Sequence, residues 1–151
     1  MKLATALSER SDIQKRLAQL KVRLNNNAKV QQGDTPSENP ADLLKELDNL
    51  TKREEELIAK INLTNSFTKT EDGTTMTELL AKRDVLRNKL SILREFLDNA
   101  SAKASRYSRT EIMMESTVSV AEQQKKLEKL SKQFRELDET IQQLNWTTDL
   151  L

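Results

Sequence analysis

Aliphatic residues recur at every third or fourth position along most of this chain, and polar residues fill the positions between them. This spacing places the apolar side chains on one face of an α-helix, with a period near 3.5 residues. The pattern runs through four segments, approximately residues 2–31, 40–68, 75–103 and 119–146. We therefore predict an all-α fold of four long helices, arranged in antiparallel hairpins or a bundle, as a single helical domain over residues 1–151.

Each predicted helix has its own apolar stripe. The first two stripes are Leu3, Ala6, Ile13, Leu17, Leu20 and Leu24, and Leu43, Leu47, Leu50, Leu57 and Ile61. The last two are Met76, Leu79, Leu86, Leu90, Leu93 and Leu97, and Val120, Leu127, Leu130, Phe134, Leu137, Ile141 and Leu144. Long, narrow helices bury little surface within one chain, and most soluble oligomers are symmetric. We therefore predict a homo-oligomer.

Residues typical of helix ends separate the four segments. Gly33 gives a stop signal, Asn39 suits an N-cap, and Pro40 suits the first helical position. Asp72-Gly73 marks a tight turn. Capping boxes open the last two helices, at Thr75 to Glu78 and at Ser119 to Glu122.

The third connection, about residues 104–118, is long and its alternating pattern is typical of a strand. Ile112, Met114 and Val118 are the apolar members of this alternation. Either the strand pairs with its symmetry mate in another subunit, or the segment covers the bundle end with Ile112 and Val118 in the core. Trp146 is expected to close the opposite end or to pack on a neighbouring subunit.

Two arginines and a tyrosine precede this alternation. Arg106, Tyr107 and Arg109 suit binding of a phosphate or carboxylate. The alternative is that they cap the carbonyls of the third helix and pair with nearby glutamates.

Charged residues also occupy three positions of the apolar stripes, Arg10, Glu54 and Arg83. Folding the helices about residues 35 and 72 is expected to bring together one polar layer of Arg10, Asn62 and Arg83, with Asn65 and Asp84 close by. Such a layer sets the register of a bundle, binds an anion or small ligand, or supports catalysis.

The composition excludes several kinds of chemistry. The chain has no cysteine and no histidine, so disulfides, thiol nucleophiles, zinc–thiolate sites and imidazole catalysis are excluded. We therefore predict no metal, no cofactor and no catalytic residue. The net charge is +1 and the pI is about 7.9, which does not favour nucleic-acid binding.

Charge is unevenly distributed along the first third of the chain. Residues 1–31 have seven basic and two acidic side chains, whereas residues 32–56 have three basic and eight acidic ones. We expect these segments to attract each other within one hairpin. No apolar run of 18 residues and no signal-peptide core are present, so we expect a cytoplasmic protein without a transmembrane segment.

Three blocks of sequence resemble the family of small bacterial helical proteins labelled septicolysin. They are INLTNSFTKTEDGTTMTELLAKRDVL, RYSRTEI and IQQLNWTTDLL, and the resemblance covers nearly the whole chain. The family label implies a cytolysin, although the function of the family is not established.

Three hypotheses for function follow. The first is a non-enzymatic, homo-oligomeric helical protein that acts by assembly or partner binding. The second is a small-ligand or anion-binding protein, or a catalytic one, that uses the polar layer. The third is a membrane-active protein, as the septicolysin resemblance implies.

Overall fold

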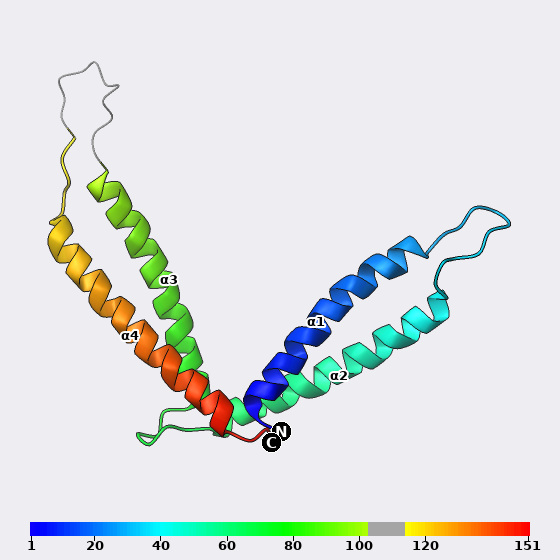
Figure 1. Ribbon diagram of the computed structural model, residues 1–151. Coiled ribbons are helices and arrows are strands. Elements are labelled where there is room, and N and C mark those ends of the chain that lie inside the picture. The colour runs from blue at the N-terminus through cyan, green and yellow to red at the C-terminus, as the bar shows by residue number, and fades with distance from the viewer. Residues whose placement is uncertain (103–113) are drawn as a thin grey trace, which may run out of the picture. The chain divides into compact units, whose positions relative to one another are not determined.

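The computed structural model describes residues 1–102 and 114–151, which form four helices (Figure 1). They are α1 (Leu3–Asn26), α2 (Pro40–Phe67), α3 (Met76–Ser101) and α4 (Val120–Thr147). Within the described ranges the only β-type pairings are two isolated bridges, so no sheet is built there. The predicted all-α fold of four helices is confirmed.

The chain divides into two compact units. The first contains Met1–Met76 and Gln142–Leu151, and the second contains Thr77–Ile141. The expectation of a single helical domain stays a prediction.

In the first unit, α1 and α2 form an antiparallel hairpin with a narrow core (Figure 1). Apart from Leu3 and Ile61, its buried side chains recur every seven residues, so one face of each helix is the most fully covered. These rows are Ala6, Ile13, Leu20 and Asn27 from the α1 side, and Leu43, Leu50, Leu57 and Thr64 from the α2 side. The neighbouring row of Leu17, Leu24 and Leu47 is only half-buried.

α1 ends at Asn26, five residues before the predicted end at residue 31. The Asn27 side chain, which is only 8% exposed, ends the helix by bonding in two directions. Its Nδ2 donates to the Arg23 carbonyl at 2.9 Å, and its Oδ1 accepts from the Glu38 amide at 3.0 Å. The long-range bond to Glu38 turns the chain back toward α2, where Asn39 caps the helix as predicted by accepting from the Ala41 amide at 3.0 Å.

The turn between α2 and α3 forms at the predicted Asp72-Gly73. The Thr70 hydroxyl and the Thr74 amide both donate to Asp72 Oδ1, and these bonds hold the pKa of Asp72 below its ordinary value. Gly73 has φ +87°, a left-handed conformation that glycine adopts without a Cβ clash.

Main-chain bonds join the two ends of the described chain within the first unit. The Leu3 amide donates to the Thr148 carbonyl at 2.9 Å, and the Leu150 amide donates to the Met1 carbonyl at 2.8 Å. The Leu151 amide donates to the Thr64 hydroxyl at 3.1 Å. Trp146 is 66% exposed, so the expectation that it closes this end is wrong. Its packing on another subunit stays a prediction.

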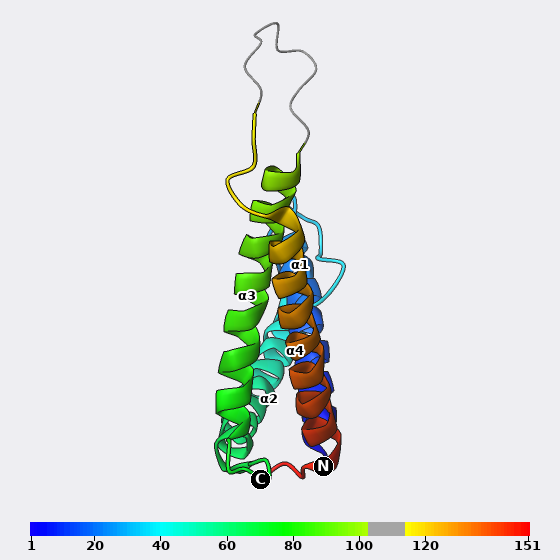
Figure 2. The same ribbon diagram turned by 90° about the vertical axis from the view of Figure 1, so that its left-hand side faces the viewer.

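In the second unit, α3 and α4 run antiparallel and side by side (Figures 1 and 2). Their core contains Leu90, Leu97 and Leu127. The partly buried side chains around it are Leu86, Leu93, Val120, Leu130 and Phe134. Ser119 caps α4, because its hydroxyl accepts from the Glu122 amide at 3.4 Å.

The predicted strand, which begins near Ile112, lies outside the described residues up to residue 113. Its described end, residues 114–118, contains no strand. The Ser116 hydroxyl donates to the Val118 carbonyl at 2.8 Å and accepts from the Val118 amide at 3.4 Å. These local bonds bend the backbone at the point where a strand would need to stay extended.

Candidate functional site

One side of the α1/α2 hairpin carries ion pairs spaced by about seven residues. Arg53 binds both carboxylate oxygens of Glu9, at 2.7 and 3.0 Å. Arg16 lies 3.4 Å from Glu46, and Arg23 lies 2.6 Å from Glu38. As the residue numbers rise along α1 from 9 to 23, the numbers of their partners fall from 53 to 38, so these contacts fix an antiparallel register. We name this the paired side of the hairpin.

The order of charges on the paired side disfavours other registers. Glu9 pairs with a basic residue of α2, whereas Arg16 pairs with an acidic one. Sliding α2 by seven residues in one direction places Glu9 opposite Glu46, and sliding it in the other places Arg16 opposite Arg53. Exposed ion pairs stabilise a fold little, but like charges in wrong alignments make them effective at selecting one register.

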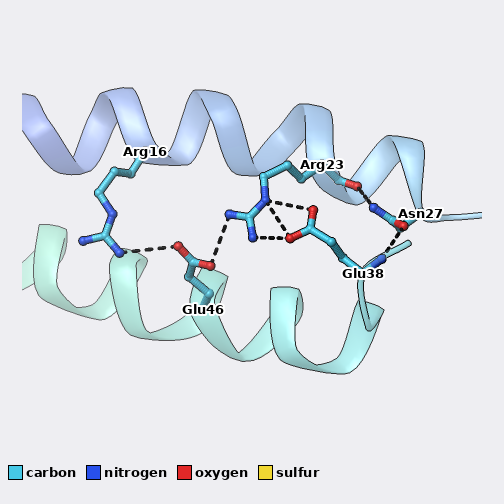
Figure 3. Close-up of polar contacts among 5 residues, drawn as sticks. All are labelled: Arg16, Arg23, Asn27, Glu38 and Glu46. Carbon is cyan, nitrogen blue, oxygen red and sulfur yellow. Dashed lines mark hydrogen bonds and ion pairs between the residues drawn. The ribbon is translucent and has the colours of Figure 1, made fainter. Parts of the chain in front are cut away.

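The paired side is most connected near the loop between α1 and α2 (Figure 3). Arg23 Nε donates to both Glu38 oxygens at 3.0 and 3.2 Å, its Nη2 donates to Glu38 Oε1 at 2.6 Å, and its Nη1 donates to Glu46 at 3.4 Å. The hydrogen bonds between the two groups lower the pKa of Glu38 and raise the pKa of Arg23. Together with Asn27, these contacts hold the loop against the end of α1.

The opposite side of the hairpin is open and apolar. A groove of about 340 Å³ lies between the helices, lined by Leu17, Lys21, Leu24, Asn25, Leu47 and Thr51. Leu44, which is 51% exposed, lies on the same face of α2, three residues before Leu47. We name this surface the open side of the hairpin.

The open side was not among the expected sites, because Leu17, Leu24 and Leu47 belong to the stripes that predict a core. In this hairpin one heptad row is buried, and the adjacent row of leucines stays partly exposed to water. The signal was present in Leu17, Leu20 and Leu24, which form an apolar surface on α1 that is wider than the area one partner helix covers.

The expected polar layer forms differently in the first unit. Because Glu9 pairs with Arg53 and Arg16 with Glu46, Arg10 lies level with residue 52 of α2, and the expected alignment with residue 61 is wrong. Asn62 is exposed and Asn65 is partly buried. Arg10 Nε is buried and has no hydrogen-bond partner among residues 1–102 and 114–151.

Arg83 belongs to the second unit, where acidic residues surround it. Its guanidinium lies 3.3 Å from Asp138 and 3.6 Å from Asp84. Asp138 was not among the expected partners, since the length of the third connection obscured the register of α4. These two carboxylates pair with the Arg83 charge within one hairpin, while its buried Nε has no hydrogen-bond partner in the described ranges.

The other expected site residues are only partly described. Arg106, Tyr107, Arg109 and Ile112 lie outside the described residues. Met114 is 77% exposed, and Val118 is half-buried. Their role in assembly stays a prediction.

Comparison with known proteins places the chain in a family. A family model described as a family of unknown function (DUF6847) matches residues 10–150. The chain belongs to this family. A solved structure described as a functionally unknown conserved protein from Corynebacterium diphtheriae is 41% identical, with a TM-score of 0.94 over 100% of this chain and 99% of that chain. No curated protein matches the chain.

The comparisons and the described residues bear on the expectations about a cytolysin, a transmembrane segment and a metal site. Neither comparison names a cytolysin, so the septicolysin resemblance gains no support from them. Of the helices in the described ranges, none is long and apolar enough to cross a membrane. In the same ranges, no three carboxylate, imidazole or thiol groups gather as metal ligands.

Proposed function

We propose that this protein is a non-enzymatic, self-assembling helical protein that binds through the open side of its α1/α2 hairpin. The observation that carries the proposal is the apolar groove between Leu17, Leu24 and Leu47, with Leu44 exposed beside it. Leucines on adjacent turns of two helices present a surface that another helix with an apolar stripe can cover. Self-assembly is favoured because every copy of the chain supplies such a surface.

Burial of these leucines provides the driving force. Full burial of one exposed leucine contributes about 1.5–3 kcal/mol, and a half-buried one contributes about half as much. Two copies contribute eight such side chains, so the gain is on the order of 10 kcal/mol. Association itself costs about 4–15 kcal/mol. The net free energy is therefore at best about −6 kcal/mol, so we expect weak self-association with a Kd of tens of micromolar or higher.

The experiment is a light-scattering mass on a sizing column, at chain concentrations from about 1 to 200 μM, across the range expected for weak association. Leu44→Lys places a charge on the open side and is expected to shift the protein toward monomer. Leu63→Lys is the matched control, because Leu63 is also on α2 and is 48% exposed against 51% for Leu44. A wild-type protein that is monomeric throughout this range rejects the proposal.

Arg10 supports a second candidate function, the binding of an anion. Its Nε is buried without a hydrogen-bond partner in the described part of the chain. Guanidinium groups bind phosphates and carboxylates through two parallel N–H bonds. Thermal unfolding with added inorganic phosphate tests this candidate. A rise in Tm that Arg10→Leu abolishes supports it, and an unchanged Tm in the wild type rejects it.

A further inference from the structure

We infer that two copies of this chain pair face to face through their open sides, with α1 of each copy against α2 of the other. This inference rests on the proposed self-assembly and adds its geometry. In this arrangement a two-fold axis runs along the hairpins, and the two α1/α2 loops lie at the same end. The product is a four-helix bundle in which every neighbouring pair of helices is antiparallel.

The size of the open side suits such a pairing. α1 contains 24 residues and is therefore about 36 Å long. Two helices side by side are about 20 Å wide, so the face offers roughly 700 Å² on each copy. Stable specific interfaces cover about 800 Å² on each partner. The open side is thus close to the area that a stable dimer needs.

Apolar contact alone allows two arrangements of the open sides. In one, the hairpins are parallel and α1 faces α2 of the second copy. In the other, the hairpins are reversed end to end and α1 faces α1. Both arrangements bury Leu17, Leu24 and Leu47 of each copy, so the charges decide between them.

The charges around the open side favour the parallel arrangement. Residues 1–31, which contain α1, are strongly basic, and residues 32–56, which contain the first half of α2, are strongly acidic. The ion pairs within the hairpin involve only some of these charged side chains. Lys21 near the groove, and Asp48 and Glu55 on α2, are exposed and have no ion-pair partner in the two described ranges. Pairing α1 with α1 places basic helices together, whereas pairing α1 with α2 places opposite charges together.

Arg10 and Glu55 provide the most specific contact in this arrangement. Arg10 is level with residue 52 of α2 in its own hairpin, one turn before Glu55, and parallel pairing preserves the level between copies. The guanidinium of Arg10, whose Nε has no hydrogen-bond partner in the described ranges, then faces the turn of the second copy that contains Glu54 and Glu55. Gln14 donates to Glu54 at 3.1 Å within the hairpin, whereas the exposed Glu55 has no hydrogen-bond or ion-pair partner in the described ranges.

Charge reversal tests this geometry in the full-length chain. In Arg10→Glu alone, each copy meets an acidic residue at Glu55, and in Glu55→Arg alone, each copy meets the basic Arg10. We expect each variant alone to dimerise at least about tenfold more weakly than the wild type, because like charges face each other twice. An equimolar mixture restores opposite charges at both contacts, so we expect heterodimers with nearly wild-type affinity. Light scattering of the mixture and native mass spectrometry of variants of distinct mass measure both effects.

A matched control separates this contact from the effect of net charge. Lys15→Glu makes the same change of charge on α1, but Lys15 is exposed about 140° around the helix from Arg10. We expect Lys15→Glu to dimerise like the wild type, and equal weakening by Lys15→Glu and Arg10→Glu overturns the contact.

The remaining outcomes distinguish this inference from the proposed function. A monomeric wild type rejects self-assembly itself. If the wild type dimerises and each charge-reversal variant dimerises equally well, the parallel arrangement is overturned while self-assembly stands. The same conclusion follows if an equimolar mixture of the two variants does not restore dimerisation.

Discussion

Replacing Asn27 with alanine tests whether one buried amide joins the end of α1 to the start of α2. Asn27 is 8% exposed and makes two side-chain hydrogen bonds, to the Arg23 carbonyl and from the Glu38 amide. The Asn27→Ala variant removes both bonds. The Arg23 carbonyl still accepts from the backbone amide of residue 27 at 3.1 Å. The Glu38 amide, in contrast, loses the acceptor that the Asn27 side chain provides.

The expected loss follows from these two bonds. Each net hydrogen bond contributes about 0.5–1.5 kcal/mol, and a donor left unsatisfied adds to the cost. We therefore expect the free energy of unfolding to fall by about 2 kcal/mol. For a chain of this size, that change corresponds to a decrease in Tm of about 4–8 °C.

Urea unfolding followed by circular dichroism at 222 nm measures this loss, at one fixed chain concentration. The control is Asn26→Ala, because Asn26 is exposed at the last position of α1 and alanine there costs nothing or stabilises slightly. Hydrogen exchange supplies a local readout, since the Glu38 amide is expected to exchange faster in Asn27→Ala only. A loss below about 0.5 kcal/mol, with unchanged exchange at Glu38, refutes the reasoning.

Three further predictions concern the core, the pH dependence and a turn. Leu57→Ala is expected to lower the free energy of unfolding by about 2–5 kcal/mol, because Leu57 is fully buried, whereas Leu63→Ala has little effect on urea unfolding. The pKa of Glu38 is lowered in the folded state by Arg23, so its contribution is present above its unfolded pKa and is lost as pH falls through the folded value. The urea midpoint should therefore fall below about pH 4.5, and less steeply in Glu38→Gln. Gly73→Ala is expected to lower the Tm measurably, with a cost of about 1–2 kcal/mol for a left-handed alanine.

Local signals account for the parts of the fold that the sequence predicted well. α2 begins at Pro40, as expected, because Asn39 and Pro40 act on the residues next to them. α3 and α4 begin one residue after their predicted starts, because the capping signals at residues 75 and 119 also act on the residues next to them. The end of α1 was missed because it depends on Asn27 reaching Glu38, eleven residues away. Helix propensities describe local sequence and therefore do not predict a contact over that distance.

The candidate site was less predictable, because it depends on how the helices align. The turn was assumed to centre on residue 35, but the pairing of Glu9 with Arg53 centres it close to residue 31. This shift moved Arg10 away from Asn62. The open side was also hidden, since a stripe tells which side chains avoid water but not how many helices share them. The seven-residue spacing of opposite charges in α1 and α2 was the signal that would have given the correct alignment.

The separation of the hairpin into a paired side and an open side has a consequence for how the sequences of this family diverge. Glu9 and Arg53 on the paired side are expected to exchange signs together, whereas Glu46 contacts both Arg16 and Arg23, so its sign is tied to two partners. Leu17, Leu24 and Leu47 have no such freedom and should change only among apolar residues. Heptad neighbours one position apart in α1 therefore evolve under different constraints, with co-variation on one side of the hairpin and fixed hydrophobicity on the other.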